Sequence, residues 1–223
     1  MKRTIYQIAI DGPSGAGKST VADRLAARFR ILHLDTGAMY RAVGLKCLRT
    51  GVSPTDAAAV EGLLATTVVD VRYEGGRQRT LLDGEDVSVA IRDNPVSKAA
   101  SDASAIQAVR TMLVAAQQAI AQRICCVLDG RDIGTKVLPE ARYKFFLTAS
   151  AEERARRRTL ELAEKGAPAD YGEILRQIQT RDYNDTHRAA SPLVCADGAH
   201  TVDSTSMSLD EVVATIAAYI TDR

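Results

Sequence analysis

Residues 12–19 read Gly-Pro-Ser-Gly-Ala-Gly-Lys-Ser and directly follow the largely apolar run 5–10. Together they form a strand running into the pattern G-x-x-x-x-G-K-[ST], which cradles phosphate groups. The glycines allow a tight turn that aims backbone N–H groups inward, at the positive end of the next helix. Val21, Leu25 and Phe29 recur at the spacing of a helix. The sequence therefore predicts a polyphosphate site at the end of its first strand.

The same segment carries the side chains that a bound nucleoside triphosphate needs. Lys18 would reach the β- and γ-phosphates, and the Ser19 hydroxyl would contact Mg²⁺. The alternative is a glycine-rich turn that binds no ligand. The predicted triphosphate-binding residues are Gly12, Pro13, Ser14, Gly15, Ala16, Gly17, Lys18, Ser19 and Thr20.

Composition excludes several classes of protein. With 46% hydrophobic and 26% charged residues among 223, the chain has the composition of a globular protein. Its net charge of +1 argues against a general nucleic-acid-binding surface. No apolar stretch approaches the roughly 20 residues that span a bilayer, and a cleaved signal peptide would destroy the phosphate loop. The four cysteines form no C-x-x-C pair, which argues against a zinc ribbon. Cys125 and Cys126 lie in an expected buried strand, so we expect reduced core thiols in a cytoplasmic enzyme.

Strand and helix patterns alternate along most of the chain. Strands are expected at 5–10, 31–34, 124–128, 144–147 and around Val202. Helices are expected at 18–29, 37–49, 151–165, 173–188 and 209–221. This alternation predicts an α/β fold of three layers, with a central parallel sheet between helices. Ligands bind at the carboxyl edge of such sheets, where the phosphate loop, Asp35 and Asp129 would lie.

Residues 66–90 interrupt this alternation. Apolar and aromatic residues at alternating positions precede Gly75-Gly76, and Leu81-Leu82 precede Asp83-Gly84. Both arrangements are typical of hairpins. We therefore expect a small antiparallel sheet inserted into the α/β core.

A second polar segment, Asp129-Gly130-Arg131-Asp132, follows the strand at 124–128. A carboxylate at this edge, near the phosphate loop, can hold a water on Mg²⁺. Arg131 and Asp132 would then face the cleft between phosphate donor and acceptor. The alternative is a solvated loop with an internal ion pair.

Four arginines crowd the helix expected at 151–165, and Arg154 and Arg158 share one of its faces. They would clamp the transferring phosphoryl group if this helix were a mobile lid. The alternative is a surface helix whose arginines pair with neighbouring glutamates.

The helix at 173–188 presents a stripe that begins apolar and becomes charged. Its members are Ile174, Ile178, Arg181, Asp185 and Arg188. A helix covering only a core would stay apolar, so the charged end suggests a polar cavity. Arg181 and Arg188 suit a phosphate, and Asp185 suits ribose hydroxyls. The alternative is a helix end exposed to water.

Ser101 and Arg110 would lie on opposite faces of one unbroken helix. Residues 104–107, Ser-Ala-Ile-Gln, read as a capping box that starts a new helix near 105. The resulting bend would bring Ser101 and Arg110 to one site. Without it, they are surface residues.

Four segments together resemble the bacterial type of cytidylate kinase over nearly the whole chain. They are IDGPSGAGKST at 10–20, LDTGAMYR at 34–41, DGRDIGT at 129–135, and Arg181-Asp182 with Asp185 and Arg188. The resemblance implies one P-loop nucleoside monophosphate kinase domain over 1–223. It has a core (1–35, 120–150 and 200–223), a monophosphate-binding part with the β insert (36–119) and a short helical lid (151–170).

The resemblance implies transfer of the γ-phosphoryl group of ATP to CMP and dCMP, with Mg²⁺ held by Ser19 and Asp129. The implied catalytic residues are Lys18, Arg131, Arg188, Arg154 and Arg158. Ser101, Arg110 and Asp132 would read the cytosine. The implied acceptor-phosphate residues are Thr36, Arg41, Arg131 and Arg188, while Arg181 and Asp185 would touch the sugar. We expect a monomer with small-molecule substrates, and neither a nucleic-acid polymer nor a membrane as partner.

Two other functions stay open at this point. Another small P-loop kinase, acting on UMP, shikimate or a coenzyme precursor, would share the core without needing the set formed by Ser101, Arg110 and Asp132. A nucleotide switch or scaffold would bind a nucleoside triphosphate without transferring its phosphoryl group. A GTP switch would need an N-K-x-D segment, which the sequence lacks.

Overall fold

The computed structural model describes residues 5–221, and its contacts divide the chain into two compact units. Of the described residues, one unit comprises residue 5 and residues 32–126, and the other comprises residues 6–31 and 127–221. The phosphate loop belongs to the second unit. Among the described residues, no helix combines the length and apolar composition required to cross a membrane.

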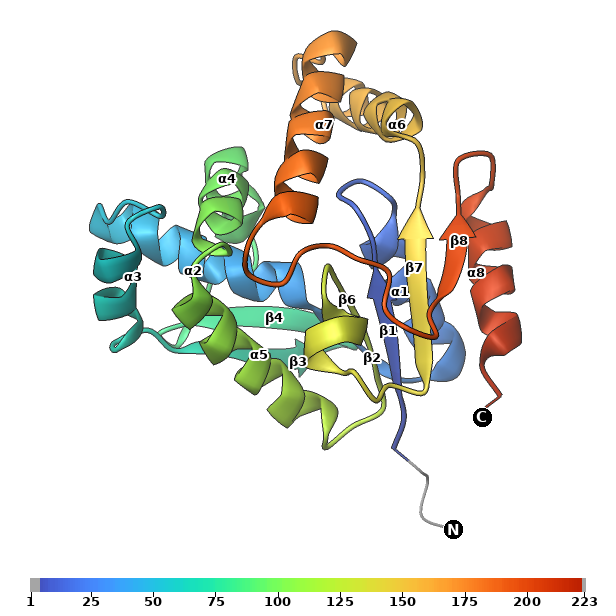
Figure 1. Cartoon of the computed structure of the whole chain (residues 1–223), viewed down its shortest axis with the longest axis horizontal. Coiled ribbons are helices and arrows are strands. Elements are labelled where there is room, and N and C mark those ends of the chain that lie inside the picture. The colour runs from blue at the N-terminus through green and yellow to red at the C-terminus, as the bar shows by residue number, and fades with distance from the viewer. Residues whose placement is uncertain (1–4, 222–223) are drawn as a thin grey trace. The chain divides into compact units, whose positions relative to one another are not determined.

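The second unit contains a sheet whose strands follow the order β6-β1-β7-β8, with helices around it (Figure 1). β1 is parallel to β7, with Ile8 opposite Tyr143, and β7 is parallel to β8. The strands are β1 (Gln7–Asp11), β6 (Cys126–Gly130), β7 (Tyr143–Thr148) and β8 (His200–Asp203). The helices are α1 (Lys18–Phe29), η2 (Ile133–Val137), α6 (Ala151–Glu164), α7 (Tyr171–His187) and α8 (Leu209–Tyr219).

The central strands of this sheet are apolar on both faces, as parallel strands covered by helices must be. Ile8, Ile10, Leu128, Phe145 and Leu147 are almost completely buried. The carboxyl ends of the strands lead into the phosphate loop after β1, the Asp-Gly-Arg-Asp segment at the end of β6, and helix α6 after β7. The α/β fold with a parallel sheet is confirmed, and it gathers the predicted polar segments of this unit at one edge.

The first unit is built around α2 and the inserted sheet. The strands are β2 (Leu32–Asp35), β3 (Val69–Glu74), β4 (Arg77–Leu82) and β5 (Glu85–Asp86). The helices are α2 (Thr36–Thr50), α3 (Ala57–Leu64), η1 (Ala90–Arg92), α4 (Asn94–Ala103) and α5 (Gln107–Ala121). α3 was not predicted. Figure 1 shows α2 running between α4 and the inserted strands.

The inserted sheet is antiparallel, in the order β3-β4-β5, as the sequence predicts. Gly75 and Gly76 have φ of 58° and 77°, and Asp83 and Gly84 have φ of 52° and 88°. Positive φ at both central residues belongs to the two-residue turn whose twist matches that of paired strands. The glycine and aspartate signals therefore located both hairpins.

One glycine fixes how closely two helices of this unit pack. A Cβ added at Gly44 on α2 would lie 2.6 Å from the backbone nitrogen of Ala100 on α4. No larger residue fits there without a shift of α4. Apolar residues of α2, β4, η1 and α4 form a common core at this junction.

Candidate active site

The phosphate loop turns where only glycine fits. Gly12 has a φ of 146°, and a Cβ at that position would lie 1.9 Å from the carbonyl oxygen of Leu147. Gly17 adopts the left-handed conformation (φ 88°) and caps α1, which begins at Lys18. The first N–H groups of a helix have no partners within it. The loop therefore ends in a cluster of donors suited to an anion.

Lys18 is held inside this loop. Its side chain is only 6% exposed, and Nζ donates a hydrogen bond to the carbonyl of Pro13 at 2.6 Å. Burial lowers the pKa of Lys18 well below its usual value, and repulsion by Arg131 lowers it further. Asp129 and Asp11 oppose this effect without cancelling it. A bound polyphosphate would supply the missing negative charge.

The two residues predicted to hold Mg²⁺ lie together. Ser19 Oγ donates to Asp129 Oδ2 at 2.7 Å, and both belong to the second unit. Within residues 5–221, no cluster of three or more histidine, cysteine or acidic side chains could hold a metal by itself. Mg²⁺ commonly takes one or two protein oxygens and fills its shell with water and substrate phosphates. The pair therefore fits Mg²⁺ bound together with a nucleotide.

Asp11 anchors the segment that carries the predicted base reader. Its two carboxylate oxygens accept the N–H groups of Ile133 and Gly134, each at 2.7 Å. These residues directly follow Asp132, which is buried at the start of η2. Asp11 therefore fixes the backbone beside both Arg131 and Asp132. No local motif pointed to this role.

The stability contributed by Asp11 is expected to fall as the pH rises. Burial raises its pKa from 3.8 to about 6, although both backbone hydrogen bonds oppose the rise. The folded state thus retains the proton more strongly than the unfolded chain. Relative to an Asp11→Asn variant, the wild type should lose about 2 kcal/mol of unfolding free energy between pH 4.5 and 7. Denaturant titrations of both proteins across this range test it. If the unfolding free energy of the wild type minus that of Asp11→Asn stays constant or grows with pH, the prediction is wrong.

Three arginines surround Asp185. Arg131 Nε donates to Asp185 Oδ2 at 2.8 Å, and Arg188 Nη1 lies 3.8 Å from Oδ1. Burial favours the neutral form of Asp185, yet Arg131, Arg181 and Arg188 outweigh it and lower its pKa. The structure thus brings three guanidinium groups to one buried carboxylate, and guanidinium groups are also the side chains that bind phosphate most specifically.

The charged end of α7 is covered, as its predicted stripe requires. Asp185 is buried, and Arg181 and Arg188 are only partly exposed. On this face the end of the helix is therefore not exposed to water, whereas its other faces are. One detail differs: α7 ends at His187, so Arg188 follows the helix in extended conformation, with Nε bonded to the carbonyl of Ser191 at 2.7 Å.

Most arginines of α6 pair with acidic neighbours. Arg156 and Arg157 both donate to Glu153, and Arg158 Nη1 donates to Glu161 at 2.7 Å. These contacts match the surface-helix alternative for the state described here. They do not test a clamp on a transferring phosphoryl group, so that role of Arg158 stays a prediction.

Arg154 differs from the others because its side chain is buried. Its guanidinium donates to the carbonyl of Ser14 in the phosphate loop and to both carboxylate oxygens of Asp182 on α7. The surface-helix alternative therefore does not describe Arg154, whose side chain is buried. Asp182 entered the sequence interpretation only as part of a motif.

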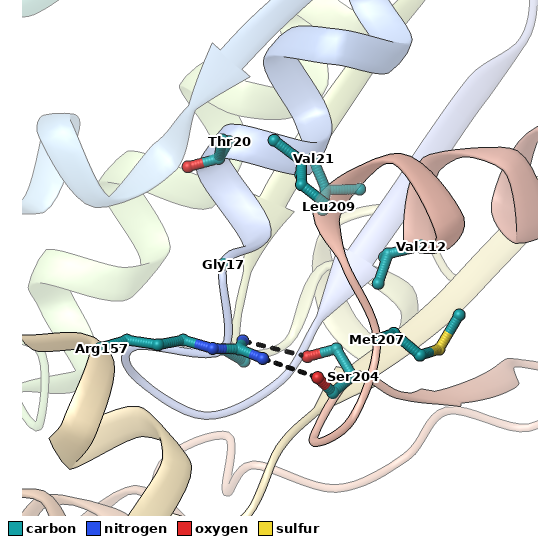
Figure 2. Close-up of a pocket in the computed structure, with 9 residues that line it drawn as sticks. Gly17, Thr20, Val21, Arg157, Ser204, Met207, Leu209 and Val212 are labelled. Atoms are coloured by element: carbon teal, nitrogen blue, oxygen red, sulfur yellow. Dashed lines mark hydrogen bonds between the residues drawn. The ribbon is translucent and has the colours of Figure 1, made fainter.

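A pocket of about 240 Å³ lies beside the start of α1 (Figure 2). Arg157 borders it, held by Ser204, whose carbonyl accepts Nη2 at 2.6 Å and whose hydroxyl accepts Nη1 at 3.4 Å. Its remaining walls are Ala16, Gly17, Thr20, Val21, Met207, Leu209 and Val212. The cavity is mostly apolar with one cation at its rim, which suits a flat aromatic ring. The sequence interpretation did not identify it.

In the first unit, Asp35 joins the end of β2 to α2. Its carboxylate accepts the N–H of Ala38 at 2.9 Å, which caps α2, and also Arg41 Nη2 at 2.9 Å and Arg92 Nη1 at 3.3 Å. Thr36 follows it and is buried. Two guanidinium groups thus share one carboxylate. Arg92 was not predicted.

The inserted sheet braces this turn. The N–H of Asp35 donates to Gln78 Oε1 at 2.8 Å, and Gln78 Nε2 donates back to the Asp35 carbonyl at 3.2 Å. The Tyr73 hydroxyl donates to the carbonyl of His33 at 3.0 Å. The insert therefore supports the backbone from which Thr36 and Arg41 project.

The predicted break near residue 104 is confirmed, because α4 and α5 are separate helices. The predicted capping box is wrong: Ile106 is the cap residue, without a side-chain bond, and Ser104 Oγ donates instead to the carbonyl of Ser101 at 2.7 Å. Buried Arg110 donates Nη1 to the carbonyl of Ser104 at 3.2 Å, and its guanidinium lies 5.6 Å from the ring centre of Tyr40. The break thus turns Arg110 toward the segment that follows Ser101.

Comparison with known proteins agrees with this geometry. The family model described as "Cytidylate kinase" matches residues 8–222. The cytidylate kinase of Caldicellulosiruptor bescii is 52% identical over 92% of this chain and 91% of its own length. That of Pelotomaculum thermopropionicum is 50% identical over 96% and 95%.

Among solved structures, a gluconokinase from Sinorhizobium meliloti 1021 shares 15% identity at a TM-score of 0.50, covering 98% of this chain and 93% of its own. At this identity, the likeness supports the fold alone. The family match over almost the whole sequence decides the assignment: the chain belongs to the cytidylate kinase family.

Proposed function

We propose that this protein transfers the γ-phosphoryl group of ATP to CMP and dCMP, giving CDP and dCDP. The observation that carries the proposal is the set of three arginines around Asp185, in the same unit as the phosphate loop. Arg131 and Asp185 both act on the charge of Lys18, so this cluster lies within electrostatic range of the loop. A protein that only binds a triphosphate has no need of a second anion site.

ATP is the proposed donor. Its phosphates would occupy the loop at residues 12–20, whose N–H groups and Lys18 neutralise them. The pocket beside Arg157 would take the adenine ring. Mg²⁺ would be held by Ser19 and Asp129, and when bound it withdraws charge from the phosphate oxygens.

The proposed acceptor residues keep the assignments that the family resemblance implies. Thr36, Arg41, Arg131 and Arg188 would bind the phosphate of CMP. Arg181 and Asp185 would contact its sugar, and the proposed cytosine readers are Ser101, Arg110 and Asp132. Support comes from burial of Arg110 and Asp132 and from the excess of arginine around Asp185.

Phosphoryl transfer of this kind needs no strong base. The acceptor phosphate is an anion at neutral pH and is itself the nucleophile. Catalysis then consists of in-line positioning and neutralisation of the charge on the moving group. Lys18, Arg131 and Arg188 would supply that neutralisation, with Arg158 closing from the lid. Exclusion of water would prevent hydrolysis of ATP.

We further propose that the enzyme is a cytoplasmic monomer. Its small net charge supports the absence of a nucleic-acid partner. The kinase family supports small nucleotides as its ligands.

Release of ADP should depend on CMP or dCMP. In a coupled assay with ATP and Mg²⁺, these two acceptors should support rapid turnover, with UMP slower and shikimate inactive. Rapid turnover with UMP or shikimate and none with CMP would favour another small kinase. Less than one turnover with every acceptor would favour a nucleotide-binding scaffold. Calorimetric titration with CMP and UMP provides the matching affinities.

A further inference from the structure

Arg154 connects three parts of the second unit. Nε donates to the carbonyl of Ala149 after β7, and Nη1 donates to the carbonyl of Ser14, both at 2.9 Å. Asp182 on α7 receives Nη1 at 3.0 Å and Nη2 at 2.5 Å. The aliphatic part lies over the phosphate loop, since a Cβ at Gly15 would be 3.5 Å from the Cβ of Arg154. One side chain thus links the sheet, the loop and α7.

The guanidinium of Arg154 is almost saturated by these partners. It has five N–H groups, and the four hydrogen bonds use four of them. The side chain is 4% exposed, and its contact with Asp182 is bidentate, the geometry in which arginine is most specific. With one N–H group left, a phosphoryl group could form a bidentate contact with this guanidinium only by displacing protein partners. The arrangement suits a fixed support better than a clamp.

Asp182 places that support next to the proposed acceptor residues. It follows Arg181 directly on α7 and lies about one turn before Asp185. At its other end, the pair holds the carbonyl of Ser14 within the loop that would bind the donor phosphates. We propose that Arg154 and Asp182 form a positioning pair that fixes α7 relative to the phosphate loop and so aligns acceptor with donor. This inference rests on the proposed function.

Breaking the pair from either side should slow phosphoryl transfer. We expect Asp182→Asn, Arg154→Ala and Arg154→Lys each to lower kcat about 10- to 100-fold at saturating ATP and CMP, as a displacement of about 1 Å can. The dissociation constant of ATP alone should change less than about threefold. The double variant Arg154→Ala/Asp182→Asn should be no slower than the slower of its two single variants, because the two residues act as a unit. Glu173→Gln, which removes an exposed ion pair on α7, is the matched control.

Other outcomes would overturn the positioning pair. If Arg154 is a clamp, Arg154→Ala will be slow while Asp182→Asn keeps or gains rate, because it frees the guanidinium. If the pair is merely structural, the melting temperature will fall while kcat per active site stays normal. Independent effects of the two residues would multiply in the double variant.

A second measurement does not depend on activity. Asp182→Asn should increase amide hydrogen exchange together in residues 12–17 and 181–187, whereas Glu173→Gln should not. Increased exchange in only one segment, or in neither, contradicts the link. If the wild type fails to turn over CMP, the proposed function falls and this exchange experiment alone decides the pair.

Discussion

Replacing Lys18 with methionine is expected to lower kcat about 100- to 1,000-fold, the usual effect of removing one preorganised group that stabilises transition-state charge. Methionine keeps the length and apolar stem of the side chain but carries no charge. Lys18 is buried and donates to the Pro13 carbonyl, so under the proposed function it would meet the donor phosphates from inside the loop. Steady-state assays with ATP and CMP, both saturating, measure the loss.

The same substitution should leave the fold intact. Burial and Arg131 both disfavour the charged form of Lys18 in the nucleotide-free protein, so removing the charge is favourable. Leaving the Pro13 carbonyl without its donor costs about 1–3 kcal/mol and opposes that gain. The melting temperature should therefore stay within about 5 °C of the wild type. Lys98→Met, at an exposed lysine of α4, is the control for both readouts. Near-normal turnover of Lys18→Met would refute the role of Lys18, and a collapse of the melting temperature would make it structural.

Features that depend on neighbouring residues could be predicted from the sequence. The phosphate loop, the helix beginning at Lys18 and both hairpin turns follow from local requirements for glycine or for periodic apolar residues. The stripe on α7 could also be predicted, because its members are three or four residues apart. The placement of Ser19 and Asp129 at one edge of the sheet could be predicted because parallel strands bring their carboxyl ends together, and the structure adds the hydrogen bond between them.

Features that depend on distant partners could not be predicted. Asp11 accepts hydrogen bonds from two residues that lie 122 and 123 positions further along the chain. No local sequence pattern around Asp11 predicts these bonds. The sequence predicts Arg154 as a lid arginine that would clamp the phosphoryl group, but it does not predict the contact of Arg154 with Asp182, 28 positions along the chain. The capping box failed because Ser104 ends α4 in a helical conformation, with its hydroxyl donating to the carbonyl of Ser101, and α5 begins only at Gln107. For Asp11 and Arg154, the partner is decided by tertiary contacts that the local sequence pattern does not contain.

Replacing Asp132 with alanine is expected to lower kcat/KM for CMP and to narrow the preference for CMP over UMP. Cytosine presents an N4 amino donor beside the acceptor N3, whereas uracil presents the acceptor O4 beside N3–H. A carboxylate therefore pairs with cytosine and meets an acceptor in uracil. A good bidentate contact discriminates by about 1–3 kcal/mol, or roughly 5- to 150-fold. Because Asp132 is buried, a mismatched partner could not be relieved by water, and discrimination can exceed that range.

The isosteric variant Asp132→Asn sharpens this test. Its amide can donate to O4 of uracil. The ratio of kcat/KM for UMP to kcat/KM for CMP should therefore be higher in Asp132→Asn than in Asp132→Ala. Glu140→Gln, an exposed acidic position in the same region of the chain, should leave both substrates unaffected. Competition assays with CMP and UMP in one reaction give the ratio of kcat/KM directly and do not depend on the active fraction of each variant. An unchanged ratio in Asp132→Ala and Asp132→Asn would show that Asp132 does not read the base, and the discrimination would then have to come from other residues.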